Sequence, residues 1–166
     1  MLANPDPALG FYNGELRFFL GWAEEVAGDH AAAKESWQQA RSELEPLVGE
    51  QPENSELLGD LALTVMGLGD KASAVAFSER AIAAVPIGRD AVNGPFVLEI
   101  LARVAARAGD PDRAIATLEK LLSIPYNSAL ASNVPLTPAL LRLDPMFEPL
   151  RNDPRFQKLA ASDAPK

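Results

Sequence analysis

Apolar residues recur at three- and four-residue spacing in six successive segments of the chain, which is the pattern of amphipathic helices. The predicted helices begin near residues 13, 30, 55, 70, 95 and 110. In the first helix, over about 13–27, we expect the packed face to consist of Leu16, Phe19, Leu20, Ala23 and Ala27. In the second, the expected inner stripe is Ala33, Trp37, Ala40 and Leu44. The pattern predicts an all-α fold.

The dipeptide Gly-Asp recurs at three regularly spaced positions. The glycines are Gly28, Gly69 and Gly109, which are 41 and 40 residues apart. Each copy has a small residue seven positions before the glycine and an alanine five positions after it. Glycine can adopt the left-handed conformation that ends one helix, and aspartate can cap the next. A side chain larger than alanine where the two helices cross would cost roughly 1–3 kcal/mol. The repeat predicts an α-solenoid of three antiparallel helix pairs.

The C-terminal part departs from the repeat. We expect Pro135 and Pro138 to bracket a turn, and Asp144-Pro145 and Asp153-Pro154 to start two short helices, because aspartate caps a helix and proline suits its first position. The apolar side of this tail is expected to cover the last repeat as a cap. It consists of Leu140, Leu141, Leu143, Met146, Phe147, Leu150, Phe156 and Leu159.

The repeats and the tail divide the chain. We expect an irregular N-terminal segment (1–12), three repeats over 13–128 (about 14–54, 55–94 and 95–128), a capping segment (129–161) and a flexible tail (162–166). Within the second predicted helix, Pro46 either bends the helix or starts another turn.

Composition narrows the possible functions. The formal net charge is −8 and the basic residues are scattered, which argues against nucleic-acid binding. The 166 residues include no cysteine and no apolar run of membrane-spanning length, so we expect no disulfide, no thiolate metal site and no membrane partner. In the absence of a recognisable signal peptide, a cytoplasmic location is the default expectation.

The residues give little support for catalysis. His30 is the only histidine and lies beside a predicted hairpin turn, so it cannot form a metal triad alone. The adjacent carboxylates Glu24 and Glu25 are more simply a solvated helix face than an acid–base pair. The segment 67–70 is a helix stop and not a phosphate-binding loop. We therefore expect neither an enzyme nor a cofactor.

The three copies resemble tetratricopeptide repeats over about 14–128. The leucine, the small residue, the Gly-Asp pair and the alanine of the second helix match in every copy. The repeats here are six or seven residues longer than the 34 usual in that family. The tail, from Leu143-Asp144-Pro145 to Asp153-Pro154-Arg155-Phe156, resembles a segment that follows such repeats in bacterial serine/threonine kinases, adenylate cyclases and winged-helix regulators. The resemblance implies a regulatory region of a larger bacterial signalling protein.

In that family the first helices of the repeats line a concave groove that takes a peptide. Carried over by position, the groove residues are Glu15, Phe18, Trp22, Glu25, Glu56, Leu63, Met66, Phe96, Glu99, Arg103 and Arg107. Phe18 and Trp22 are the expected anchors, unless both are buried against the N-terminal segment. An acidic surface suits a basic peptide, although ordinary solubility charge is the simpler explanation.

The resemblance implies a non-catalytic protein-interaction scaffold that binds a peptide or a protein surface in this groove. The alternative is a structural spacer or a self-association domain, in which repeat faces or the N-terminal edge pair with a second copy.

Overall fold

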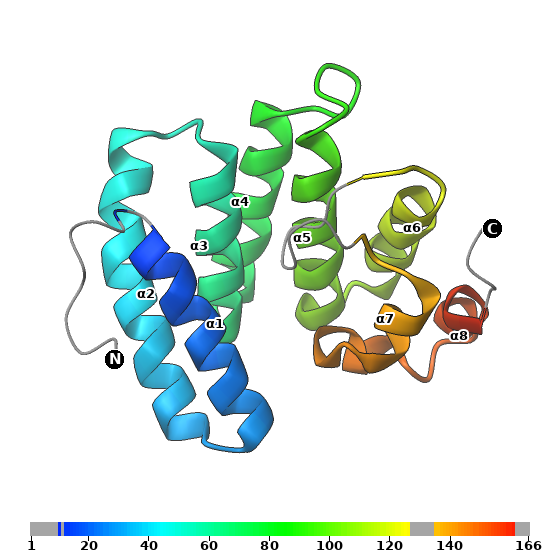
Figure 1. The fold of residues 1–166 in the computed structure, drawn as a ribbon, viewed down its shortest axis with the longest axis horizontal. Helices are drawn as coiled ribbons and strands as arrows, with labels where there is room; N and C mark the ends of the chain where they lie inside the picture. Colours follow the sequence, from blue (N-terminus) through cyan, green and yellow to red (C-terminus); the bar gives the residue numbers. More distant parts are fainter. Residues whose placement is uncertain (1–9, 11, 127–134, 162–166) are drawn as a thin grey trace. The chain divides into compact units, whose positions relative to one another are not determined.

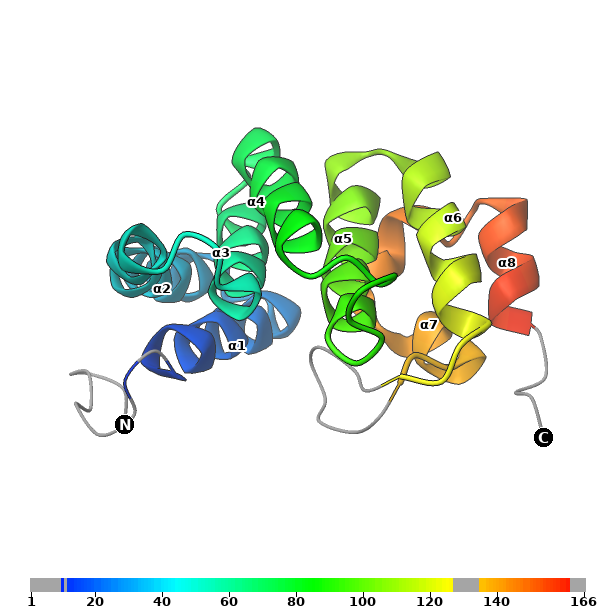
Figure 2. The same ribbon diagram turned by 90° about the horizontal axis from the view of Figure 1, so that it is seen from above.

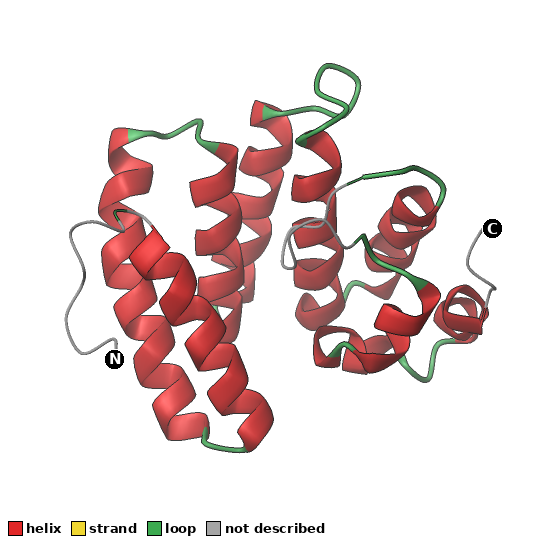
Figure 3. Cartoon of the chain, viewed as in Figure 1, coloured by secondary structure: helices red, strands yellow, loops and turns green. Residues whose placement is uncertain are grey.

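The computed structural model describes residues 10, 12–126 and 135–161, and within these ranges the chain is helical and has no strand (Figure 3). Contacts divide the chain into two compact units, which are described separately: unit 1, Met1–Ala84, and unit 2, Val85–Lys166. Unit 1 contains α1 (Tyr12–Ala27), α2 (His30–Glu50), α3 (Ser55–Gly67) and α4 (Lys71–Ala84). Unit 2 contains α5 (Gly94–Ala108), α6 (Pro111–Leu122), α7 (Pro138–Leu143), the 3₁₀ helix η1 (Pro145–Leu150) and α8 (Pro154–Ala161).

The three repeated Gly-Asp dipeptides form the turns of three helical hairpins, as predicted. Helices α1 and α2, α3 and α4, and α5 and α6 pack as pairs around these turns (Figure 1). Each glycine has a left-handed φ: 87° at Gly28, 84° at Gly69 and 91° at Gly109. Each aspartate side chain accepts a hydrogen bond from the backbone N–H three residues later, at Ala32, Ser73 and Arg113. Because this chemistry is local, the sequence was sufficient to predict it.

Trp37 is the residue around which α1, α2 and α3 meet in unit 1. It projects from α2 onto two glycines: a Cβ added to Gly21 of α1 would lie 2.7 Å from its ring, and one added to Gly67 of α3 would lie 2.5 Å from it. The indole Nε1 donates a hydrogen bond of 3.3 Å to the carbonyl oxygen of Phe18. The glycines therefore let three helices approach one large aromatic side chain.

The prediction for the packed face of α1 is wrong. The buried residues are Asn13, Gly14, Arg17, Phe18 and Gly21, whereas Leu16 and Leu20 are exposed. Spacing favoured the side with Leu16 and Leu20, whereas the buried side carries two glycines, Asn13 and Arg17 and so lacks an apolar pattern. The face with the glycines packs against α2 because its small residues leave room for Leu44 as well as for Trp37.

The tail packs against the α5–α6 hairpin, which confirms the predicted contact within unit 2. Figure 2 shows α8 beside α6, and η1 contacts α5. The shared core consists of Ala102, Ala105, Ala106, Ala114, Ile115, Leu118, Leu121, Leu136, Leu141, Phe147, Leu150, Phe156 and Ala160. Leu143, which we assigned to the buried side, is 75% exposed. It is the last residue of the short helix α7, and its neighbour Asp144 turns inward instead.

One helix boundary differs from the prediction. Pro138 begins a helix instead of closing a turn, because the Thr137 side chain accepts a hydrogen bond from the Leu140 N–H and caps it. Helix α2 runs through Pro46 as far as Glu50. Most of the predicted segment 1–12, the flexible tail 162–166 and residues 129–134 of the capping segment lie outside the described residues.

Candidate functional site

The residues assigned to the peptide groove are divided between the two units. Those from α1 and α3 belong to unit 1, and Phe96, Glu99, Arg103 and Arg107, all from α5, belong to unit 2. The groove as one continuous surface therefore remains a prediction. What the structure gives is the environment of each side chain within its own unit.

Several of the assigned groove residues are buried, so their assignment as partner contacts is corrected. They are Phe18, Leu63, Met66, Glu99 and Arg103. Glu15, Trp22, Glu25, Phe96 and Arg107 are half-buried, and Glu56 is exposed. The burial of Phe18 agrees with the alternative that this side chain is covered, and it disagrees with the role of an exposed anchor. Its ring lies 5.4 Å from the ring of Phe19, and the segment that we expected to cover it lies outside the described residues.

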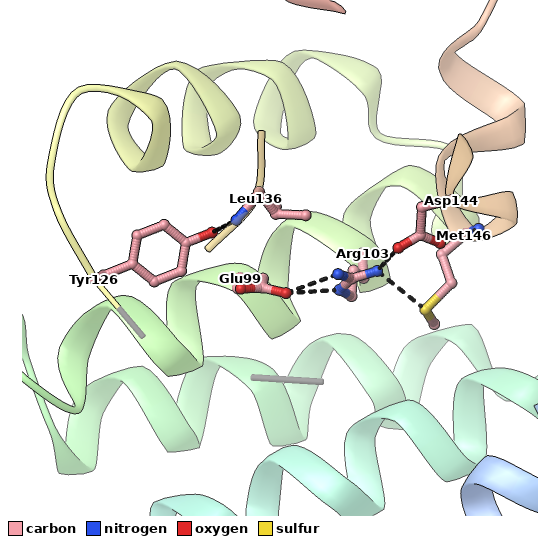
Figure 4. A network of polar contacts seen from close by, with 6 residues as sticks. All are labelled: Glu99, Arg103, Tyr126, Leu136, Asp144 and Met146. Carbon is pink, nitrogen blue, oxygen red and sulfur yellow. Dashed lines mark hydrogen bonds and ion pairs between the residues drawn. The ribbon is translucent and has the colours of Figure 1, made fainter. Parts of the chain in front are cut away.

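Glu99 and Arg103 form a buried ion pair in unit 2 (Figure 4). Arg103 is 3% exposed and Glu99 is fully buried. The Nε and Nη2 atoms of Arg103 donate to Oε1 of Glu99 at 3.3 and 2.7 Å. The guanidinium also lies 5.1 Å from the ring centre of Phe147, a cation–π arrangement. Two of the predicted ligand contacts therefore belong to the core.

Asp144 connects the tail to this pair. Its Oδ2 accepts a hydrogen bond from Nη1 of Arg103, which also contacts the sulfur of Met146 (Figure 4). Its Oδ1 accepts from the backbone N–H of Met146 and caps η1. The charges of Asp144 and Glu99 raise the pKa of Arg103 against the opposing effect of burial, so the guanidinium stays charged. The Asp-Pro motif predicted the cap but not the ion pair.

Tyr126, which follows α6 in the chain, belongs to the same polar network as Glu99. Its hydroxyl oxygen accepts a hydrogen bond from the Leu136 N–H at 3.0 Å (Figure 4). Burial, and then the negative charge of Glu99, raise the pKa of the phenol. Arg103, Asp144 and Tyr126 together hold the tail against α5. We therefore assign these three side chains a structural role.

A row of apolar side chains is exposed along α1. Tyr12, Leu16 and Leu20 follow one another at one-turn intervals and are 48, 41 and 37% exposed, and Val26 is 61% exposed. Phe19 is half-buried beside them, and Ala23 and Ala27 are exposed. We call this set of residues the α1 face. Large apolar residues gathered on one helix face, and not scattered singly, mark an interaction surface.

The internal repeat shows how an equivalent face is covered elsewhere in unit 1. The residues of α3 that lie 41 positions after Leu16 and Leu20 are Leu57 and Leu61, and both are fully buried. Helix α3 packs against α1 and α2, the preceding hairpin. Gly67, the repeat equivalent of the exposed Val26, lies against Trp37 of that hairpin. The first repeat thus exposes positions that the second repeat buries.

Three carboxylates cluster where α1 meets α3. Burial raises the pKa of Asp60 well above its ordinary value, and the charges of Glu15 and Glu56 raise it further. Burial, and then the charge of Glu56, raise the pKa of Glu15. The Oδ2 of Asp60 and the Oγ1 of Thr64 are buried without a hydrogen-bond partner. Among the residues that the structure describes, no group of acidic or histidine side chains has the arrangement of a metal site.

No protein-family model, no curated protein and no solved structure matches the chain. In the described part of the chain, none of the helices combines the length and apolar character needed to span a bilayer. The resemblance to tetratricopeptide repeats therefore stays a prediction, and the α1 face is the strongest candidate site.

Proposed function

We propose that this chain is a non-catalytic protein-interaction scaffold, a short solenoid of the tetratricopeptide type whose helix α1 docks a partner protein. The observation that carries the proposal is the α1 face, with Tyr12, Leu16, Leu20 and Val26 exposed on a helix that is otherwise packed in the hairpin. Covering such side chains stabilises a complex by about 25 cal/mol for each Å² of apolar surface removed from water.

The two residues that flank the α1 face suit contact with a partner protein. Trp22 and Glu15 flank the α1 face and are half-buried, so each keeps part of its surface for a partner. The ring of Trp22 is held 6.2 Å from that of Trp37, which limits its freedom before binding. A restrained aromatic beside an apolar row is a typical anchor of an interface. The resemblance of the tail supports placing the scaffold in a larger bacterial signalling protein.

Self-association is the second candidate function. It is favoured by the same face, because its exposed side chains are nearly all apolar and two copies could pair them around a twofold axis. Sedimentation of the chain at micromolar concentrations separates the two functions. A monomer at every concentration contradicts self-association, and a dimer that dissociates in the Leu16→Glu/Leu20→Glu variant supports it.

The main proposal is tested by affinity capture followed by identification of the captured protein. The immobilised chain is compared with Leu16→Glu/Leu20→Glu and with the matched control Leu143→Glu, which introduces the same charge at an exposed leucine of unit 2. We expect one identified protein to bind the parent chain and the control and to be lost from the α1 variant. Equal capture by all three chains contradicts docking on α1.

A further inference from the structure

We propose that the α1 face binds an amphipathic helix of another protein, with apolar side chains at one-turn intervals and lysine or arginine along its edges. This inference rests on the proposed function and specifies the chemistry of the partner. It is argued from the row of side chains on α1, from the way unit 1 covers the equivalent row on α3, and from the charges beside the row.

The arrangement of the row selects a helix. Tyr12, Leu16 and Leu20 are four residues apart and form a ridge along α1, and ridges of this kind pack into the grooves of a neighbouring helix. Within unit 1, the equivalent residues Leu57 and Leu61 lie on a helix that packs against other helices, and no strand is present in the described ranges. An extended peptide would leave this ridge partly uncovered, because its side chains alternate in direction.

The charges beside the row select a basic partner. Glu15 lies next to Leu16 and close to Glu56 of α3. Glu24 and Glu25 are directed towards α2 instead, where Glu24 accepts a hydrogen bond from Ser36 and Glu25 pairs with His30, each at 2.7 Å. The only basic residue of α1, Arg17, is 4% exposed and pairs with Glu43 at 2.7 Å. The edge of the face at Glu15 and Glu56 is therefore acidic, and lysine or arginine along the edges of a docked helix would complement it.

The same charges disfavour a second copy of the chain as the occupant. A copy would bring the same acidic side chains, Glu15 and Glu56, to the contact, and the chain as a whole carries a formal charge of −8. Like charges that face each other across an interface oppose association. Dimerisation through α1 is therefore an outcome of the test that would contradict the inference.

The probe is an 18-residue model peptide of leucine, alanine and lysine, with leucines at one-turn intervals and lysines along both edges. Its two twins have glutamate in place of lysine, or the same residues in scrambled order. Fluorescence anisotropy of each labelled peptide is measured against the full chain and against Leu16→Glu/Leu20→Glu, Glu15→Gln and the control Leu143→Glu. Circular dichroism checks that each variant is folded, and Val26→Glu serves as a second α1 variant.

We expect the lysine peptide to bind the parent chain and Leu143→Glu with a dissociation constant of about tens of micromolar, as for other small interfaces. Binding should weaken at least about tenfold in the α1 variants and for the glutamate twin, and about two- to threefold in Glu15→Gln and in high salt. Equal binding of all three peptides, or an unchanged affinity in the α1 variants, overturns the inference.

The outcome also separates this inference from the proposed function. If affinity capture identifies a partner that depends on Leu16 and Leu20 but the lysine peptide does not bind, the helical basic partner is wrong and the scaffold function stands. If neither experiment depends on these two residues, both proposals fail.

Discussion

Replacing Arg103 by methionine should destabilise unit 2 severely. Glu99 is fully buried, and Arg103 supplies two of its hydrogen bonds and the positive charge beside it. Methionine fills a similar volume but leaves the carboxylate of Glu99 without a cation. Breaking a buried ion pair in this way costs about 3–5 kcal/mol. Since whole domains are stable by only about 5–15 kcal/mol, unit 2 would lose a large fraction of its stability.

The assay is urea unfolding followed by far-UV circular dichroism, which reports the helices of both units. Both tryptophans, Trp22 and Trp37, belong to unit 1, so their fluorescence reports that unit separately. With a slope of about 1 kcal/mol per molar urea, the expected loss moves the unit 2 transition by about 3–5 M. The double variant Glu99→Gln/Arg103→Met should recover part of it, because the fully buried carboxylate is then gone and only Asp144, which is 20% exposed, is left without its cation.

The matched control is Arg155→Met, the same substitution at an exposed arginine. Arg155 pairs with Asp112 and Asp153 at 2.7 Å, and it is half exposed, so its removal should leave the transition nearly unchanged. The reasoning is refuted if Arg103→Met and Arg155→Met shift the transition equally. It is also refuted if the double variant is less stable than Arg103→Met alone.

Three further substitutions test the packing and the buried charge of unit 1. Gly21→Ala should lower its free energy of unfolding by about 1–3 kcal/mol, because the added Cβ meets the Trp37 ring; Gly49→Ala, whose Cβ meets no atom within 4 Å, should instead raise it by about 0.5–1 kcal/mol in urea unfolding. Asp60→Asn should raise the melting temperature at pH 7, and the gain should shrink towards pH 4. Because the pKa of Asp60 is raised, this residue contributes its full stability below its ordinary pKa of about 4, and that contribution is lost as the pH rises. A gain in melting temperature that is constant with pH contradicts this assignment.

The parts of the fold that the sequence could predict are those decided by neighbouring residues. The turns at Gly28, Gly69 and Gly109 follow from a left-handed glycine and the aspartate after it, and both were confirmed. The starts at Asp144-Pro145 and Asp153-Pro154 follow from the same capping chemistry and were also confirmed. Thr137-Pro138 carried this signal too, although Pro138 was interpreted as a turn residue.

The parts that could not be predicted depend on residues far apart in the chain. Spacing predicted that the side of α1 with Leu16 and Leu20 is buried, but the fit of Trp37 and Leu44 onto Gly21 and Gly14 buries the other side. Arg103 was assigned to a ligand groove because its partner Asp144 lies 41 residues later, in a segment without the repeat. Position within a repeat therefore predicted the helices and their caps more reliably than it predicted the direction of a side chain.

The orientation of α1 is the claim on which the docking proposals depend, and cysteine labelling measures it directly. The chain has no cysteine, so single variants Leu16→Cys, Leu20→Cys and Phe18→Cys each place one thiol on the helix. A maleimide reagent should modify Leu16→Cys and Leu20→Cys rapidly under native conditions and Phe18→Cys slowly, with all three equal in urea. Rapid modification of Phe18→Cys together with protection of Leu16→Cys and Leu20→Cys would contradict the account.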